Sequence, residues 1–153
     1  MKKQNVLSLF LIISLIAGLV QVCTISASAY DNTYEINSGS VTVSASGNYY
    51  ISGTDSSTAN GITVAENISG SVYIALDVVA ISSSSDCAFS IGSGSTVYLT
   101  LLETNSLTSG PDFSGLNLPS GAALIITSGS TGSLTAQGGP IGADIGGGQG
   151  GAG

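Results

Sequence analysis

The sequence has no histidine and no tryptophan, and its only basic residues are Lys2 and Lys3. Nine Asp and Glu residues give the chain a formal net charge of −7. A surface of this kind repels phosphate, so nucleic acid is not an expected partner, whereas metal cations are attracted. Nucleophilic triads need a His or Lys base, which the chain lacks after Lys3. We therefore expect a protein that is not an enzyme.

Cysteine is almost absent as well. Cys87 is the only cysteine after residue 29, so an intrachain disulfide cannot form in that part of the chain. This residue precedes a predicted strand. We expect a small packed side chain at Cys87 and not a reactive thiol.

The segment 1–29 has the three parts of an export signal. Lys2 and Lys3 form a basic start, residues 6–22 form an apolar run, and Ala27-Ser28-Ala29 is a small-x-small cleavage motif. An uncleaved membrane anchor is the alternative, but the run is slightly short for a span. We expect a secreted, extracellular protein, free or associated with the cell surface. Its mature chain begins at Tyr30 and has no membrane span.

Helical periodicity is missing after residue 30, and short apolar-x-apolar units recur there instead. A first set recurs at a constant spacing: Ile62-x-Val64, Phe89-x-Ile91, Leu116-x-Leu118 and Ala143-x-Ile145. A second set recurs at a slightly shorter constant spacing: Tyr49-x-Ile51, Ile74-x-Leu76, Leu99-x-Leu101 and Leu124-x-Ile126. A third set contains Ile81, Leu107 and Leu134. Alternation with a period of two indicates half-buried strands, three in each repeat of about 26 residues.

This pattern predicts an all-β fold, a right-handed single-stranded parallel β-helix of about four three-strand coils. Residues 49–137 would form the coils, and residues 30–48 an irregular N-terminal cap. The Gly-rich residues 138–153 would be a truncated coil or a tail. No cap is visible at the C-terminal end, which favours a piece of a longer protein over a complete chain with a flexible tail.

Three tyrosines are the candidate ligand-binding residues. In Val72-Tyr73-Ile74 and Val97-Tyr98-Leu99 the apolar flanks point inward, so both tyrosines point outward. By the same register Tyr50 points outward one coil earlier, one column over. A platform of Tyr50, Tyr73 and Tyr98 would present aromatic rings to the C–H faces of sugars. The alternative is that the tyrosines stack across coils only for stability.

Carboxylates form a second candidate site. Asp77 and Glu103 each follow a strand of the second set, and Asp86 and Asp112, in line with Asn60, each precede a strand of the first set. Each pair would lie on adjacent coils, where a calcium ion could bridge the two carboxylates. The alternative is that they are solvated turn residues. Glycoside hydrolysis also needs two carboxylates, but no motif of such hydrolases surrounds Asp77 and Glu103.

Several segments resemble bacterial "carbohydrate-binding domain" surface proteins. They are Gly47-Asn48-Tyr49-Tyr50-Ile51-Ser52-Gly53, Gly61-Ile62-Thr63-Val64 and Val72-Tyr73-Ile74-Ala75-Leu76-Asp77, followed by similar stretches at 99–107 and 132–136. The resemblance implies a parallel β-helix like that of polysaccharide lyases, and binding of acidic plant polysaccharide and calcium. The tail at 142–148 resembles Gly-rich repeats of clostridial surface adhesins.

Together these features predict an extracellular, non-catalytic carbohydrate-binding module. Its partner would be a polysaccharide of the plant cell wall or a host glycan, and Ca²⁺ would be its only cofactor. Calcium would bridge the acidic columns to the carboxylates of a pectin-like ligand, because a bare polyanion repels such a ligand. The alternative is a structural or adhesive repeat segment of a larger surface protein, without a ligand of its own.

Overall fold

The computed structural model describes residues 30–147, which form thirteen short β-strands and one 3-10 helical turn, η1 (Ile36–Ser38). The predicted export signal and residues 148–153 lie outside the described residues. No helix within residues 30–147 has the length and apolar character needed to cross a membrane.

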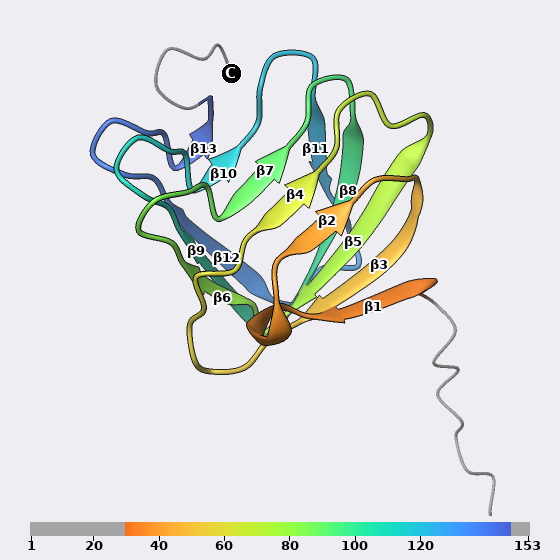
Figure 1. Ribbon diagram of the computed structural model, residues 1–153. Helices are drawn as coiled ribbons and strands as arrows, with labels where there is room; N and C mark the ends of the chain where they lie inside the picture. The colour runs from red at the N-terminus through yellow and green to blue at the C-terminus, as the bar shows by residue number, and fades with distance from the viewer. Residues whose placement is uncertain (1–29, 148–153) are drawn as a thin grey trace, which may run out of the picture.

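The strands build three parallel sheets, A, B and C (Figure 1). The chain adds strands to sheets A and B in turn, and from β6 on also to sheet C. Sheet A contains β1 (Asn32–Glu35), β3 (Gly47–Ser52), β5 (Ser71–Asp77), β8 (Thr96–Leu102) and β11 (Ala123–Ile126). Sheet B contains β2 (Val41–Val43), β4 (Ile62–Val64), β7 (Phe89–Ile91), β10 (Leu116–Asn117) and β13 (Ile145–Gly146). Sheet C contains β6 (Ala80–Ser82), β9 (Thr104–Thr108) and β12 (Ser133–Gln137). The predicted all-β parallel β-helix of about four coils is confirmed.

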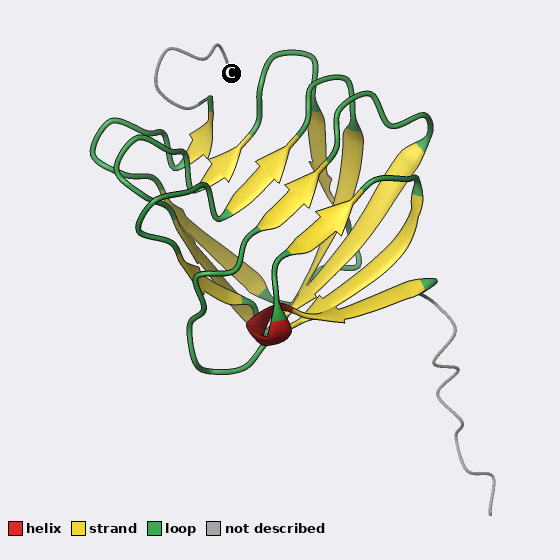
Figure 2. Ribbon diagram, viewed as in Figure 1, coloured by secondary structure: helices red, strands yellow, loops and turns green. Residues whose placement is uncertain are grey.

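The core lies between the three sheets, and loops join the strands at its corners (Figure 2). The inward columns follow from the alternation in the sequence. Ile62, Phe89 and Leu116 are register partners in sheet B, and each is at most 1% exposed. Sheets A and C contribute similar columns, including Ile74 with Leu99 and Ile81 with Leu107. No single coil could bury these side chains alone.

Residues 30–48, which the sequence assigns to an irregular N-terminal cap, contain β1, η1 and β2. Strand β1 pairs with β3, and β2 pairs with β4, so this segment extends two of the sheets. The partners Val41 and Ile62 are closer in sequence than the next partners in sheet B, Ile62 and Phe89. The separation in this short coil therefore does not match the constant spacing of the later coils.

The predicted register of the last coil is wrong by two residues in all three sheets. Leu99 pairs with Ile126 instead of Leu124, Leu116 with Ile145 instead of Ala143, and Leu107 with Ala136 instead of Leu134. Of the connections before these strands, the one before β12 is longer than in the preceding coil, since residues 127–132 separate β11 from β12 whereas Glu103 alone separates β8 from β9. By register, the connections before β11 and β13 keep the length that they have in the preceding coil. Because side chains alternate with a period of two, a two-residue shift keeps the same faces inward and leaves the pattern unchanged.

Two inward isoleucines of this last coil are exposed. Ile126 is 49% exposed and Ile145 is 52% exposed, although their partners Leu99 and Leu116 are fully buried. The difference arises because each coil buries the apolar column of the previous one.

Candidate functional site

The outer face of sheet A carries one apolar column. Tyr73 on β5 pairs with Tyr98 on β8, which pairs with Ile125 on β11. Tyr73 is 46% exposed and Ile125 is 38% exposed, while Tyr98 is half-buried. We call Tyr73, Tyr98 and Ile125 the aromatic column. A run of exposed apolar side chains on one face marks an interaction surface more often than a single exposed residue does.

The Tyr73 and Tyr98 rings stack on each other, with centroids 4.9 Å apart and planes inclined by 20°. Nearly parallel rings this close overlap in an offset stack and do not lie side by side in one plane. The free face of the stack belongs to Tyr73, whose neighbour on the other side is the shorter Asn48. The predicted flat platform is thus a pair of overlapping rings with one open face.

Tyr50 does not join this pair. It pairs with Ala75, one column away, and its ring centroid lies 5.2 Å from that of Tyr30. Its hydroxyl donates a hydrogen bond to the Asp77 carboxylate. This bond, together with partial burial, raises the pKa of Tyr50 to about 12, so the hydroxyl stays a neutral donor. Of the three predicted tyrosines, the structure brings together Tyr73 and Tyr98.

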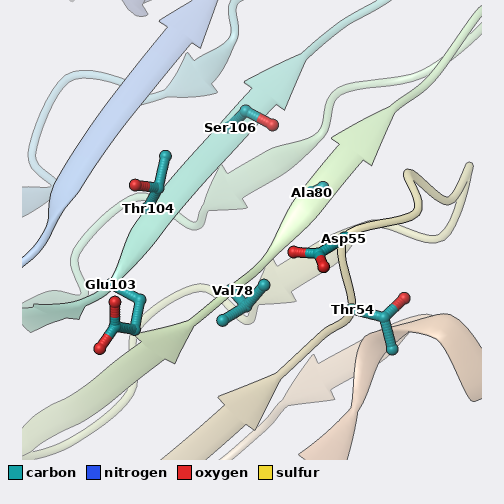
Figure 3. Close-up of a pocket in the computed structure, with 7 residues that line it drawn as sticks. All are labelled: Thr54, Asp55, Val78, Ala80, Glu103, Thr104 and Ser106. Atoms are coloured by element: carbon teal, nitrogen blue, oxygen red, sulfur yellow. The ribbon is translucent and has the colours of Figure 1, made fainter.

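A groove of about 330 Å³ lies on the outer side of sheet C (Figure 3). Its lining comes from three segments: Thr54 and Asp55 before β4, Val78 and Ala80 at the start of β6, and Glu103, Thr104 and Ser106 at the start of β9. We call this the sheet C groove. Its volume is at the small end of the range for ligand pockets, roughly 300–1,000 Å³.

The corner between sheets A and C positions Val78 and Glu103 in the groove. In two successive coils the chain turns there at a residue with a positive φ angle, 56° at Val78 and 51° at Glu103. Behind them, the fully buried Asn105 accepts a hydrogen bond from the Val79 N–H at 2.9 Å and donates one to the Leu102 carbonyl at 2.8 Å. These bonds hold the corner that carries Glu103.

The loop that forms the other wall is tied down along its length. The Gly53 N–H donates to the Asp77 carbonyl at 2.9 Å, and the Thr54 N–H donates to the Asn37 side chain at 3.1 Å. The Asn37 amide in turn donates to the Ser56 carbonyl at 2.9 Å. A Cβ atom at Gly53 would lie 2.6 Å from the Val78 carbonyl oxygen, so only glycine allows the loop to approach this closely.

The predicted pairing of Asp77 with Glu103 is wrong. Asp77 pairs with Leu102, because β5 and β8 repeat at an interval one residue shorter than the separation of the two carboxylates. Glu103 instead occupies the corner position that Val78 has in the preceding coil. The two carboxylates therefore belong to different columns.

Asp86 and Asp112 lie in the loops before β7 and β10, where the Asp86 carbonyl accepts a hydrogen bond from the Gly110 N–H at 3.0 Å. Their pairing stays a prediction. Within residues 30–147, no group of three or more Cys, Asp or Glu side chains has the arrangement of a metal site. Calcium binding stays a prediction.

Cys87 is half-buried, and its thiol lies 3.2 Å from the carbonyl oxygens of Phe89 and Ser114. Burial raises the pKa of the Cys87 thiol, so the reactive thiolate is disfavoured. Packing, and not reactivity, is what this environment favours, as expected from the sequence.

Sequence reasoning missed most of the sheet C groove. It selected Glu103, but as a partner of Asp77, and it did not select Thr54, Asp55, Val78 or Thr104. The groove joins two segments at equivalent repeat positions, around Val78 and Glu103, to the loop of Thr54 and Asp55, which lies outside the repeats. The signal that could have indicated it is the short turn after a strand of sheet A, at Val78 and then at Glu103, which recurs at the same interval as the strands of sheet A.

A comparison with protein-family models matches residues 37–139 to a family described as "Carbohydrate-binding domain-containing protein". The matched region is more than half of the chain and includes Tyr73, Tyr98 and every residue of the sheet C groove. Searches of curated proteins and of solved structures gave no match.

Proposed function

Since the chain belongs to the carbohydrate-binding domain-containing family, we propose that it is a non-catalytic module that binds a glycan on the outer face of sheet A. The observation that supports this location is the exposed aromatic column. Sugar rings present C–H groups on their faces, and a tyrosine ring offers them an apolar surface with a polar hydroxyl at its edge.

The neighbours of the column suit the same ligand. The Asn48 side chain lies in the column beside Tyr73 and is hydrogen-bonded to Asp31 at 3.1 Å. Tyr50 and Asp77 lie in the two next outward columns. Apolar ring faces with polar groups at their margin are the combination found in small-molecule sites, where a few polar groups fix orientation.

Calcium-assisted binding of an acidic polysaccharide remains our expectation for one class of ligand. Residues 30–147 contain nine carboxylates and no basic side chain, so a uronate-rich glycan approaches a surface of its own sign. A bridging cation is therefore required for such a ligand, whereas an uncharged glycan needs none. We also propose that the module acts outside the cell, on the strength of the predicted export signal.

A glycan microarray probed with the full chain tests the function. We expect binding to a restricted group of glycans. Binding of uncharged glycans should be unaffected by EDTA. Acidic glycans, such as polygalacturonate, should bind in the presence of calcium and be released by EDTA. Circular dichroism on the same sample serves as the control for folding. A folded protein that binds no glycan would overturn the function, and acidic glycan binding that persists in EDTA would overturn the role of calcium.

A further inference from the structure

We propose that the sheet C groove binds one uncharged sugar residue, whose ring packs on Val78 and Ala80 while its hydroxyls donate hydrogen bonds to Asp55 and Glu103. This second site rests on the proposed glycan-binding function. It lies around the corner from the aromatic column and shares none of its residues.

The floor and walls of the groove differ in polarity. Val78 and Ala80 are half-buried and form an apolar floor along the start of β6. Thr54 and Asp55 line one side, and Glu103, Thr104 and Ser106 line the other (Figure 3). A pyranose has this same division, with C–H groups on its face and hydroxyls around its rim. The groove therefore fits a single ring lying flat on β6.

The two carboxylates of the groove are free to accept hydrogen bonds. Elsewhere in the described chain, five carboxylates already accept them from protein groups: Asp31, Glu35, Asp77, Asp86 and Asp144. The side chains of Asp55 and Glu103 accept none from any group within residues 30–147, and both are exposed. Ionised carboxylates only accept hydrogen bonds, so their ligand must donate, as sugar hydroxyls do.

Charge restricts the class of sugar. A uronate would bring a third negative charge between Asp55 and Glu103, and the groove contains no basic side chain to offset it. An uncharged sugar avoids this repulsion. Calcium usually takes six to eight oxygen ligands, which is more than the two carboxylates of the groove supply, so the groove fits a sugar better than a calcium ion.

The groove is also preorganised, since hydrogen bonds within the protein fix both of its walls before a ligand binds. The bonds from Gly53 and Thr54 to the Asp77 carbonyl and the Asn37 side chain hold one wall, and the Asn105 bonds hold the corner with Glu103. A ligand that enters a rigid groove loses less free energy to ordering the protein.

Amide chemical shifts of the full chain, titrated with cellobiose, maltose, xylobiose and lactose, test this inference. We expect at least one of these sugars to shift the amides of Val78, Ala80 and Ser106, in EDTA as well as in calcium. The affinity read from these shifts should fall about tenfold or more in Asp55→Ala and in Glu103→Ala, because each loses a charge-assisted hydrogen bond. Glu66→Ala is the matched control, since Glu66 is another exposed glutamate without a side-chain hydrogen bond in residues 30–147.

The outcomes separate the two proposals. Groove shifts that persist in Tyr73→Ala/Tyr98→Ala but weaken in the two carboxylate variants support the second site. Shifts confined to sheet A, or groove shifts unchanged by both carboxylate variants, overturn the second site and leave the proposed function standing. If CaCl2 displaces the sugar from the groove, the site is a cation site and the inference is wrong. No shift with any of these sugars overturns the inference, and the microarray then decides the function independently.

Discussion

Replacing Phe89 by alanine should lower the free energy of unfolding by about 3–5 kcal/mol, the usual cost of truncating a buried aromatic side chain. Phe89 is the largest fully buried side chain of the described chain. It lies on β7, between Ile62 on β4 and Leu116 on β10. Both neighbouring strands are hydrogen-bonded to β7, so the backbone has little freedom to collapse into the cavity.

Urea unfolding of Phe89→Ala and the wild type measures this loss. The control is Thr63→Ala, which removes an exposed side chain from the adjacent strand β4 and should change stability by less than about 0.5 kcal/mol. If Phe89→Ala cost less than about 1 kcal/mol, the interior column of sheet B would not be packed as described.

Replacing Asn105 by leucine should lower the free energy of unfolding by roughly 2–6 kcal/mol, because the Val79 N–H and the Leu102 carbonyl lose their partner at about 1–3 kcal/mol each. The Asn105 oxygen is the acceptor for the Val79 N–H of the preceding coil. The Asn105 amide donates to the Leu102 carbonyl of its own coil and, at 3.2 Å, to the Ser133 carbonyl of the next. One side chain thus ties three coils together at the corner.

Leucine has a branched shape similar to that of asparagine but makes none of these bonds, so the loss reports mainly the polar contribution. Asn117→Leu is the control, since the Asn117 amide makes one bond, to the Ser90 hydroxyl on the outer face. Thermal unfolding should show a marked fall in melting temperature for Asn105→Leu and little change for Asn117→Leu. Equal effects of the two variants would contradict the role assigned to the corner.

The fold was predictable because its main signal is local and repeated. Apolar residues that alternate over three to five positions identify strands and their inward faces without knowledge of neighbouring coils. The register between coils was harder to predict from the sequence than the strands themselves. A slip of two residues leaves every face unchanged, which is why Leu124 was matched to Leu99 although Ile126 is its partner.

The candidate sites were less predictable than the fold, because they depend on the register between coils and on loops. Tyr73 and Tyr98 share one column because β5 and β8 repeat at the interval that separates these two tyrosines in the sequence. The offset of Tyr50 by one column was also predictable, because the match of Tyr49 with Ile74 places Tyr50 level with Ala75, and the register confirms it. Asp55 belongs to a loop without any repeat, and its place in the sheet C groove depends on the Asn37 bonds that hold that loop.

The central claim is that glycan binds at the aromatic column. Isothermal titration calorimetry tests it most directly, with an oligosaccharide that binds in the microarray titrated into the full chain and into Tyr73→Ala/Tyr98→Ala. The control is Tyr34→Ala, which removes another exposed tyrosine that stacks on the inward-facing Tyr49 at the N-terminal end. We expect the affinity to fall about tenfold or more in the double variant, through the loss of ring stacking. Tyr34→Ala should bind like the wild type. Unchanged affinity in a folded double variant would contradict the account.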